Sequence, residues 1–374
     1  MTQASPSGRI QQLQSLRFFA AAVVLYGHVL MEMRQHGSGF GGWTYDLPWG
    51  GGVDIFFVIS GFIMLFISGS VPRTARAAAD FLIKRVLRIA PLYWFFTLLM
   101  ALVVALMASR VAQGSVRADE LVRSLLFIPY VRDGEQSARP LLGQGWTLNY
   151  EFFFYTLFAL VLALTARRFL WTTVILAALT LVGALVPLPP ALAFLCGPIL
   201  LLFAAGLALA HWHGRLPRHG TPVAIAMILG VALWSATVAR TQDPDPWLRL
   251  VLRGVPAILL VYALLLWRSP PRALTHGTLP LLGDASYALY LSHPFVVNAM
   301  LIAFIELGLE LGGLFAIVTA LAAIAVSVIV FYLLEKPLLR WTTRTYRRST
   351  FGIRGGGKIP VRADSLAFQP DARS

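Results

Sequence analysis

The sequence predicts an all-α, polytopic membrane protein with about ten transmembrane helices around a polar cavity. Of its 374 residues, 57% are hydrophobic and only 13% are charged, and the mean hydropathy is +0.71. A soluble domain usually carries about 25% charged residues. The long apolar runs lack the alternating pattern, in segments of about ten residues, that a membrane β-barrel requires. Because an open sheet leaves its edge groups unsatisfied in lipid, we expect these runs to be helices.

Ten apolar segments are long enough to cross a bilayer as helices. Turn-forming residues separate them, including the proline-rich stretch 187–190, residues 214–222 and Ser269-Pro270-Pro271. The expected spans are residues 13–33, 51–69, 88–109, 146–165, 169–186, 191–210, 222–239, 249–267, 285–305 and 311–334.

The distribution of basic residues predicts the orientation of these spans. With the N-terminus in the cytoplasm, most of the 31 Lys and Arg fall in inside segments, as the positive-inside rule requires. Both termini are therefore expected to be cytoplasmic. We expect a flexible N-terminus over residues 1–10, a membrane domain over 11–340 and a basic, flexible C-terminal tail over 341–374.

Arg17 and His28 lie eleven positions apart within the first apolar run. A helix turns about 100° per residue, so the two side chains are expected within about 20° of each other and about 16 Å apart along the axis. Ionisable side chains inside a membrane are costly and usually face a protein interior or a water-filled path. A lone buried histidine is more often a satisfied core residue, but an arginine on the same face favours a functional role.

Two acidic residues are expected toward the outer ends of the second and fourth spans. Asp54 is a helix N-cap, a site residue or both. Glu151 follows Trp146 by five positions, and its alternative role is to complement the helix dipole. Both acids enter the membrane from the same side as His28, and a histidine oriented by a carboxylate is a common general base. Which acid pairs with His28 stays open, and Trp146 is expected to line the same cavity.

Lys84, Arg85 and Arg88 lie where the second inside loop is expected to meet the third span. Anchoring at the membrane surface explains Lys84 well. Arg85 and Arg88 are three positions apart and share one helix face. With Arg17 they are predicted to form a cytoplasmic arginine cluster that is suited to binding phosphate groups.

Polar residues also mark the start of the ninth span. Ser286, Tyr290 and His293 follow a spacing of three to four residues and share a helix face. Such a stripe faces a cavity or a partner helix, so we expect these residues to line the cavity, with packing as the alternative. Pro294 is expected to kink the helix and to free a backbone carbonyl.

Neither a metal nor a nucleic acid is expected as a partner. Cys196 is the only cysteine, and the histidines at 211, 213 and 219 have no acidic or cysteine partner nearby in the sequence. The net charge of +14 suits nucleic acid in principle. The positive-inside bias of a membrane protein explains it better, because no soluble domain remains to bind nucleic acid.

The polar motifs occur in a fixed order along the chain. They are Leu16-Arg17-Phe18-Phe19-Ala20 with His28, the stretch 52–62 around Asp54, Arg85-Val86-Leu87-Arg88, Trp146-Thr147-Leu148 with Glu151, the stretch 286–294, and Glu335-Lys336-Pro337. In this order they resemble the motifs of the acyltransferase-3 family of bacterial integral-membrane acyltransferases. The resemblance covers residues from about 10 to about 340, nearly the whole membrane region.

The resemblance implies transfer of an acyl group, often acetyl, from cytoplasmic acyl-CoA to a hydroxyl of a surface or lipid-linked glycan, in the bacterial inner membrane. The paired Arg and His of the family correspond to Arg17 and His28, its paired arginines to Arg85 and Arg88, and its carboxylate to Glu151. The hypothesis is that the three arginines bind the CoA phosphates. His28 then acts as general base, with Glu151 or Asp54 fixing its tautomer, or forms a transient acyl-histidine.

Two other classes of protein compete with this interpretation. A transporter or flippase of a lipid-linked sugar or an acyl carrier explains a polar cavity equally well. It predicts paired broken helices and symmetry between the two halves of the chain, and neither is evident in the sequence. A purely structural scaffold leaves the intramembrane Arg, His and Glu without a purpose.

Overall fold

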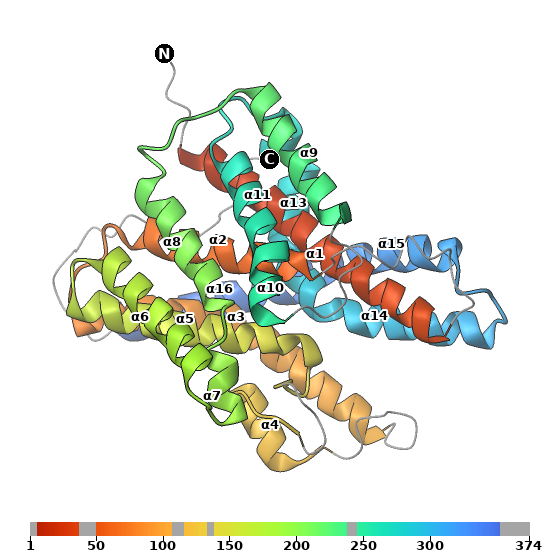
Figure 1. The fold of residues 1–374 in the computed structure, drawn as a ribbon. Helices are drawn as coiled ribbons and strands as arrows, with labels where there is room; N and C mark the ends of the chain where they lie inside the picture. The colour runs from red at the N-terminus through yellow and green to blue at the C-terminus, as the bar shows by residue number, and fades with distance from the viewer. Residues whose placement is uncertain (1–5, 37–49, 107–115, 133–137, 238–244, 352–374) are drawn as a thin grey trace.

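Helices form almost all of the chain that the structure describes. The structure is a computed structural model, and it describes residues 6–36, 50–106, 116–132, 138–237 and 245–351 (Figure 1). Among these residues, nine helices are long and apolar enough to cross a membrane, and the apolar helix at Thr221–Ala236 is somewhat shorter. The predicted class, an all-α polytopic membrane protein, is confirmed.

Each predicted span is helical, and most of them coincide with a single helix. The first half of the chain forms α1 (Pro6–His36), α2 (Gly51–Ser68), α3 (Ala75–Leu106), α4 (Ala118–Leu125), the 3₁₀ turn η2 (Gly143–Gly145), α5 (Trp146–Leu164) and α6 (Arg168–Leu185). The second half forms α7 (Pro190–Leu195), α8 (Leu200–Trp212), α9 (Thr221–Thr237), α10 (Pro246–Arg249), the π-helical turn η3 (Leu250–Gly254), α11 (Val255–Leu265), α12 (Arg272–Thr275), α13 (Thr278–Asp284), α14 (Ser286–Glu306), α15 (Gly313–Val330), the π-helical turn η4 (Phe331–Glu335) and α16 (Lys336–Phe351).

The helix boundaries differ from the prediction at several places. α1 begins at Pro6, although residues 1–10 were expected to be flexible. α3 begins at Ala75, so Arg85 and Arg88 lie inside a helix and not at its start. The predicted sixth span is divided between α7 and α8, where Gly197-Pro198 interrupts the helical hydrogen bonding. α16 extends to Phe351 although a flexible tail was expected from residue 341. The remaining tail residues, 352–374, and residues 1–5 of the expected flexible N-terminus lie outside the described ranges.

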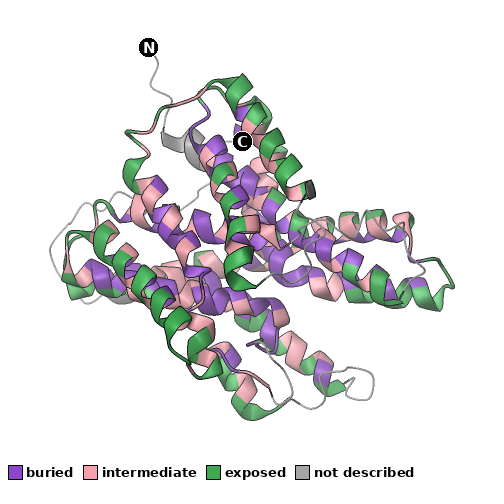
Figure 2. Cartoon of the chain, in the orientation of Figure 1, coloured by how far each residue is buried: buried purple, intermediate pink, exposed green. Residues whose placement is uncertain are grey.

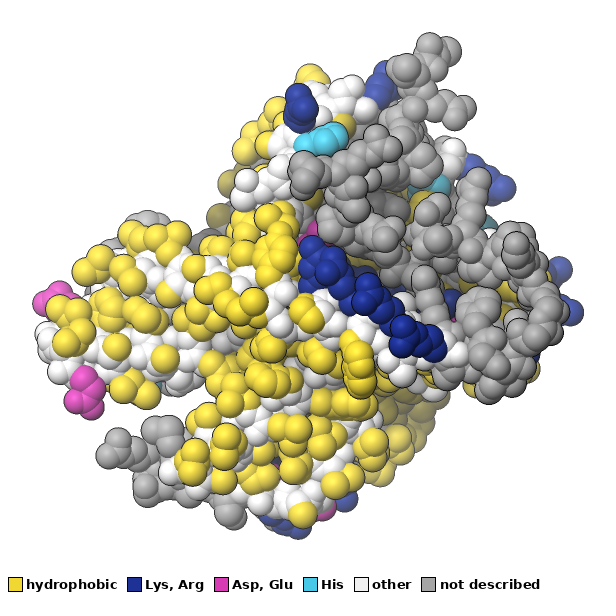
Figure 3. All heavy atoms as spheres, turned by 180° about the vertical axis from the view of Figure 1, so that it is seen from behind, with side chains coloured by type: hydrophobic (Ala, Val, Ile, Leu, Met, Phe, Trp, Pro, Cys, Tyr) yellow, Lys and Arg dark blue, Asp and Glu magenta, His cyan; other side chains and the backbone are white. Residues whose placement is uncertain are grey.

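α1 occupies the centre of the bundle. It packs against α2, α11, α13, α14 and α15, and its buried residues lie among those of the neighbouring helices in Figure 2. By contrast, α6 and α15 expose large apolar side chains, for example Leu185 at 73% and Leu314 at 63%. Figure 3 shows one face of the molecule as mostly hydrophobic, as expected for a surface in contact with lipid.

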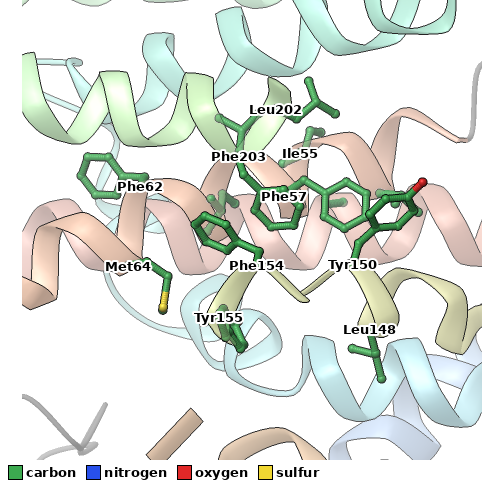
Figure 4. Close-up of a cluster of buried hydrophobic side chains, with 14 of the residues drawn as sticks. Ile55, Phe57, Phe62, Met64, Leu148, Tyr150, Phe154, Tyr155, Leu202 and Phe203 are labelled. Atoms are coloured by element: carbon green, nitrogen blue, oxygen red, sulfur yellow. The ribbon is translucent and has the colours of Figure 1, made fainter. Parts of the chain in front are cut away.

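An aromatic cluster joins α2, α5 and α8. The ring of Phe203 lies 4.3 Å from that of Phe154 and 4.9 Å from that of Phe57, measured between centroids (Figure 4). Tyr150 also packs against Phe57 in this cluster. These contacts hold α5 against α2 and thereby place Glu151 beside the middle of α2.

Candidate active site

Arg17 lies in a polar cluster at the end of α1 that the charge pattern predicts to be cytoplasmic. Its Nη1 donates a hydrogen bond to Gln14 Oε1 at 3.1 Å, and Gln14 Nε2 donates to Asp284 Oδ1 at 2.9 Å. The Arg17 charge also interacts with the charges of Arg88 and Glu335. Burial raises the pKa of Asp284 above its ordinary value, although the charges of Arg17 and Arg88 act in the opposite direction.

Arg85 and Arg88 belong to the same charged region. Arg85 interacts electrostatically with Arg88 and with Glu151, and its guanidinium lies 5.8 Å from the ring centroid of Phe81. Arg88 faces the charges of Arg17, Asp284 and Glu335. The structure therefore brings together the three arginines that the sequence grouped as a phosphate site, and it adds acids that balance their charge.

Glu335 is the most buried of these acids. It lies at the end of η4, is 5% exposed, and faces the backbone of Ala288 at the first turn of α14. The charges of Arg88 and Arg17 attract the Glu335 carboxylate, and the charge of Asp284 repels it.

Glu151 lies near the arginines and is held by two hydroxyl groups. Its Oε1 accepts hydrogen bonds from Ser60 Oγ at 2.7 Å and from the hydroxyl of Tyr155. Its charge acts on Arg17 and Arg85, and also on the hydroxyl of Tyr290 farther along α14. The carboxylate is thus oriented by two hydroxyl groups from α2 and α5.

The tautomer of His28 is determined by the backbone of its own helix. Nδ1 lies 2.9 Å from the carbonyl oxygen of Val24, one turn earlier in α1. A carbonyl only accepts hydrogen bonds, so Nδ1 must carry the proton, and Nε2 carries the lone pair of the neutral ring. The role that the sequence analysis gave to Glu151 or Asp54, fixing this tautomer, is therefore supplied by Val24.

His293 shares the environment of His28. The two ring centroids are 4.8 Å apart, and the rings lie edge to face. His293 Nδ1 lies 3.0 Å from the Leu289 carbonyl oxygen, which fixes the same tautomer as in His28. His293 is 1% exposed, and its Nε2 has no hydrogen-bond partner among the described residues. Two basic nitrogens are thus held in one small region.

Tyr290 connects α14 to the start of α5. Its hydroxyl donates to the Gln144 carbonyl at 2.9 Å and lies 2.9 Å from Thr147 Oγ1. Pro294 has no N–H, so the helix leaves the Tyr290 carbonyl without its usual partner. Gln144 Nε2 donates toward this carbonyl at 3.5 Å and toward the next one, Leu291, at 3.3 Å. The predicted free carbonyl is present, and a side chain from η2 satisfies it.

Ser286 occupies the first turn of α14, two residues after Asp284. It is fully buried, and its Oγ has no hydrogen-bond partner among the described residues. Of the predicted stripe on α14, His293 lies beside His28 and Tyr290 lies beside His293, whereas Ser286 lies at the start of the helix, next to Asp284 of the charged cluster.

Asp54 belongs to a different cluster. It is 1% exposed and accepts a hydrogen bond from Arg249 Nη2 at 2.7 Å. Arg249 also lies over Trp146, 5.6 Å from the ring centroid. Gly52 faces α1, because a Cβ there would lie 2.3 Å from the Ala20 carbonyl oxygen. Asp54 is two residues farther, about 200° around the helix, and so points away from α1.

Several residues of the site were absent from the sequence analysis. Local spacing gave a signal for two of them: Gln14 precedes Arg17 by three residues, and Tyr155 follows Glu151 by four. The others approach from distant parts of the chain, where no local pattern indicates a contact. They are Ser60, Gln144, Arg249 and Asp284.

Comparison with known proteins bears on the activity. The sequence pattern of the acyltransferase domain family matches residues 10–336. The exopolysaccharide production protein ExoZ of Rhizobium meliloti (strain 1021) is 32% identical over 309 residues, which cover 81% of this chain and 93% of that protein. Nodulation protein 10 of Rhizobium leguminosarum bv. viciae is 25% identical over 377 residues, covering 91% of this chain and 96% of that protein. No solved structure matches the chain significantly.

The family match spans nearly the whole membrane region, and the ExoZ match exceeds 30% identity over most of both chains. The motif residues lie within the matched range, and the fold is a multi-pass helical bundle. The chain therefore belongs to the acyltransferase-3 family and is a membrane-bound acyltransferase.

Proposed function

We propose that this enzyme transfers an acyl group, acetyl in the simplest case, from cytoplasmic acyl-CoA to a hydroxyl group of a cell-surface or lipid-linked glycan. The observation that carries the proposal is the arrangement along α1. Arg17 lies in a cluster of arginines and acids at one end, and His28 lies beside His293 toward the other. The name of the relative ExoZ, an exopolysaccharide production protein, supports a glycan acceptor. The bacterial inner membrane is the corresponding location.

The arginine cluster is proposed as the donor site. Arg17, Arg85 and Arg88 come from α1 and α3, and their charges interact with one another in pairs. Guanidinium groups bind phosphate oxygens through two parallel hydrogen bonds, which favours them over lysine for such ligands. The charges of Glu151, Asp284 and Glu335 offset the mutual repulsion of the arginines.

His28 is proposed as the general base. Its Nε2 takes the proton of the acceptor hydroxyl while that oxygen forms a bond to the thioester carbonyl carbon. The carbon–sulfur bond then breaks, and the departing thiolate takes the proton from His28, giving an ester and free CoA. Because the Val24 carbonyl accepts from Nδ1–H, Nε2 is the ring nitrogen whose lone pair takes part in both transfers. General-base catalysis is worth about 10²–10⁴-fold, so positioning of both substrates must contribute as well.

The proposal is tested with purified protein, radiolabelled acetyl-CoA and a purified glycan acceptor. We expect label in the glycan with the unchanged protein and loss of at least about 100-fold with His28→Ala. His211→Ala is the matched control, because His211 is an exposed histidine that stacks on Phe169 outside the polar region. Transfer that persists in His28→Ala would remove this residue from the mechanism. No transfer by the unchanged protein to any bacterial glycan would overturn the proposed reaction.

A further inference from the structure

A chain of two hydrogen bonds connects Arg17 to a residue of α13, far away in the sequence. We propose that Gln14 and Asp284 are positioning residues that hold the Arg17 guanidinium in the orientation needed to bind the phosphate groups of the acyl donor. This inference rests on the proposed function. Neither residue touches the reacting atoms in this scheme, because both act through Arg17.

The orientation of the Gln14 amide follows from its two partners. The Arg17 guanidinium can only donate and the Asp284 carboxylate can only accept. The Gln14 carbonyl must therefore face Arg17, and its NH₂ group must face Asp284, as the distances of 3.1 and 2.9 Å indicate. Glutamine has both an acceptor for Arg17 and a donor for Asp284. Leucine has neither group, and an ionised glutamate has only acceptors.

The backbone holds the second partner close to the first. A Cβ on Gly283 would lie 2.0 Å from the Gln14 carbonyl oxygen, so only a glycine lets α13 approach α1 this closely. Ser15 Oγ adds a hydrogen bond of 2.9 Å to the Leu274 carbonyl of α12. Gln14 itself is 3% exposed. Gln14 is thus buried between α1 and α13, with a polar neighbour on each side, as a positioning role requires.

The charges around Arg17 explain why it needs such support. Arg88 repels it, whereas Asp284, Glu335 and Glu151 attract it. Without a fixed hydrogen bond the guanidinium is free to turn toward any of these acids. Gln14 occupies one N–H of Nη1 and leaves the remaining donors of the planar fork for a ligand. The geometry thus favours a ligand with several acceptor oxygens, such as a phosphate group.

The first test compares two acyl donors in the Gln14→Leu variant. We expect KM for acetyl-CoA to rise roughly tenfold, the effect of losing a hydrogen bond to a charged group, while kcat changes little. With S-acetylpantetheine, an acyl thioester without phosphate groups, kcat/KM should equal that of the unchanged protein. Gln12→Leu is the matched control, because Gln12 is 4% exposed on the same helix and its Oε1 has no hydrogen-bond partner among the described residues.

The second test reverses the direction of one hydrogen bond. Gln14→Glu keeps an acceptor for Arg17 but faces Asp284 with a second carboxylate, so KM for acetyl-CoA should rise. Adding Asp284→Asn places an amide donor opposite the new glutamate and restores the total charge of the unchanged protein. The KM of the double variant for acetyl-CoA should therefore return most of the way to that of the unchanged protein. If Gln14→Glu acted only by impairing folding, the second substitution would not restore KM.

The outcomes separate this inference from the proposed function. Failure of the unchanged protein to use acetyl-CoA would overturn the proposed function itself. If the unchanged protein is active, equal KM values for Gln14→Leu and Gln12→Leu would overturn the positioning role. An equal loss of activity with acetyl-CoA and with S-acetylpantetheine would also overturn it, and so would a double variant no better than Gln14→Glu.

Discussion

The imidazole rings of His28 and His293 lie edge to face with their centroids 4.8 Å apart, although the residues come from the first and the ninth predicted spans. Each ring uses Nδ1 to donate to the carbonyl four residues earlier in its own helix. Each Nε2 is therefore a base in the neutral ring. The pairing gives His293 a place beside the proposed general base, where the sequence indicated only a residue lining a cavity.

Replacing His293 is expected to impair catalysis more than folding. The Nε2 of His293 is buried without a partner among the described residues, so it is available to accept a hydrogen bond from the acceptor hydroxyl. We expect His293→Ala to lower kcat about 10-fold, less than the roughly 10²–10⁴-fold of general acid–base catalysis, because His293 only accepts a hydrogen bond in this scheme. Ser292→Ala is the control, because Ser292 is 2% exposed on the adjacent position of α14. Similar rates for both variants would exclude His293 from the reaction.

The Gln144 side chain is expected to stabilise α14 at Pro294. In Gln144→Leu the Tyr290 carbonyl, which Pro294 leaves without its helical donor, loses the Gln144 amide. This should lower the free energy of unfolding by about 1–3 kcal/mol. Pro294→Ala restores the N–H that normally binds the Tyr290 carbonyl, so Gln144→Leu should cost less in that background. Apparent melting temperatures in detergent measure both effects. Equal losses in the two backgrounds would contradict this role of Gln144.

The Asp54–Arg249 pair is expected to stabilise the fold without taking part in catalysis. Arg249→Gln leaves a carboxylate that is 1% exposed without its charged partner, a change that costs up to about 3–5 kcal/mol. Asp54→Asn combined with Arg249→Gln should be more stable than Arg249→Gln alone. The yield of folded protein and kcat per folded molecule are the two measurements. A loss of kcat in folded Asp54→Asn would return Asp54 to the catalytic residues.

The pH dependence of stability should reveal Asp284. Burial raises the pKa of this carboxyl group, so its ionisation at neutral pH opposes folding, and this contribution vanishes as the pH falls below its ordinary pKa. Asp284→Asn should therefore melt at a higher temperature than the unchanged protein at pH 7. The difference should shrink as the pH approaches about 4. A variant that melts lower at pH 7 would show that the attraction to Arg17 outweighs burial.

The sequence predicted those parts of the site that depend on the repeat of one helix. The face shared by Arg17 and His28, the pair Arg85 and Arg88, and the carbonyl freed by Pro294 all follow from positions within a few turns. The lengths of the apolar runs predicted ten spans, of which nine are long enough among the described residues and the helix at Thr221–Ala236 is shorter. These features are local, so elementary helix geometry is sufficient.

Contacts between helices were beyond such reasoning. Asp54 and Glu151 enter from the same side and carry the same charge, so depth alone does not separate them. The packing of the helices separates these two acids. The close contact of Gly52 with α1 turns Asp54 toward Arg249, 195 residues later in the chain. Glu151 instead meets Ser60, 91 residues away. Pairings of this kind depend on how the helices cross, which a single sequence does not specify.

The carbonyl that orients His28 belongs to the main chain of Val24, and this has a consequence for genetics. Any amino acid at position 24 other than proline supplies the same oxygen wherever the helix persists. A saturation mutagenesis screen would therefore show that His28 does not tolerate substitution, but it would not detect the carbonyl that orients it. Only an ester-for-amide replacement in the peptide linkage between Val24 and Leu25, which weakens that oxygen as an acceptor, would expose the dependence.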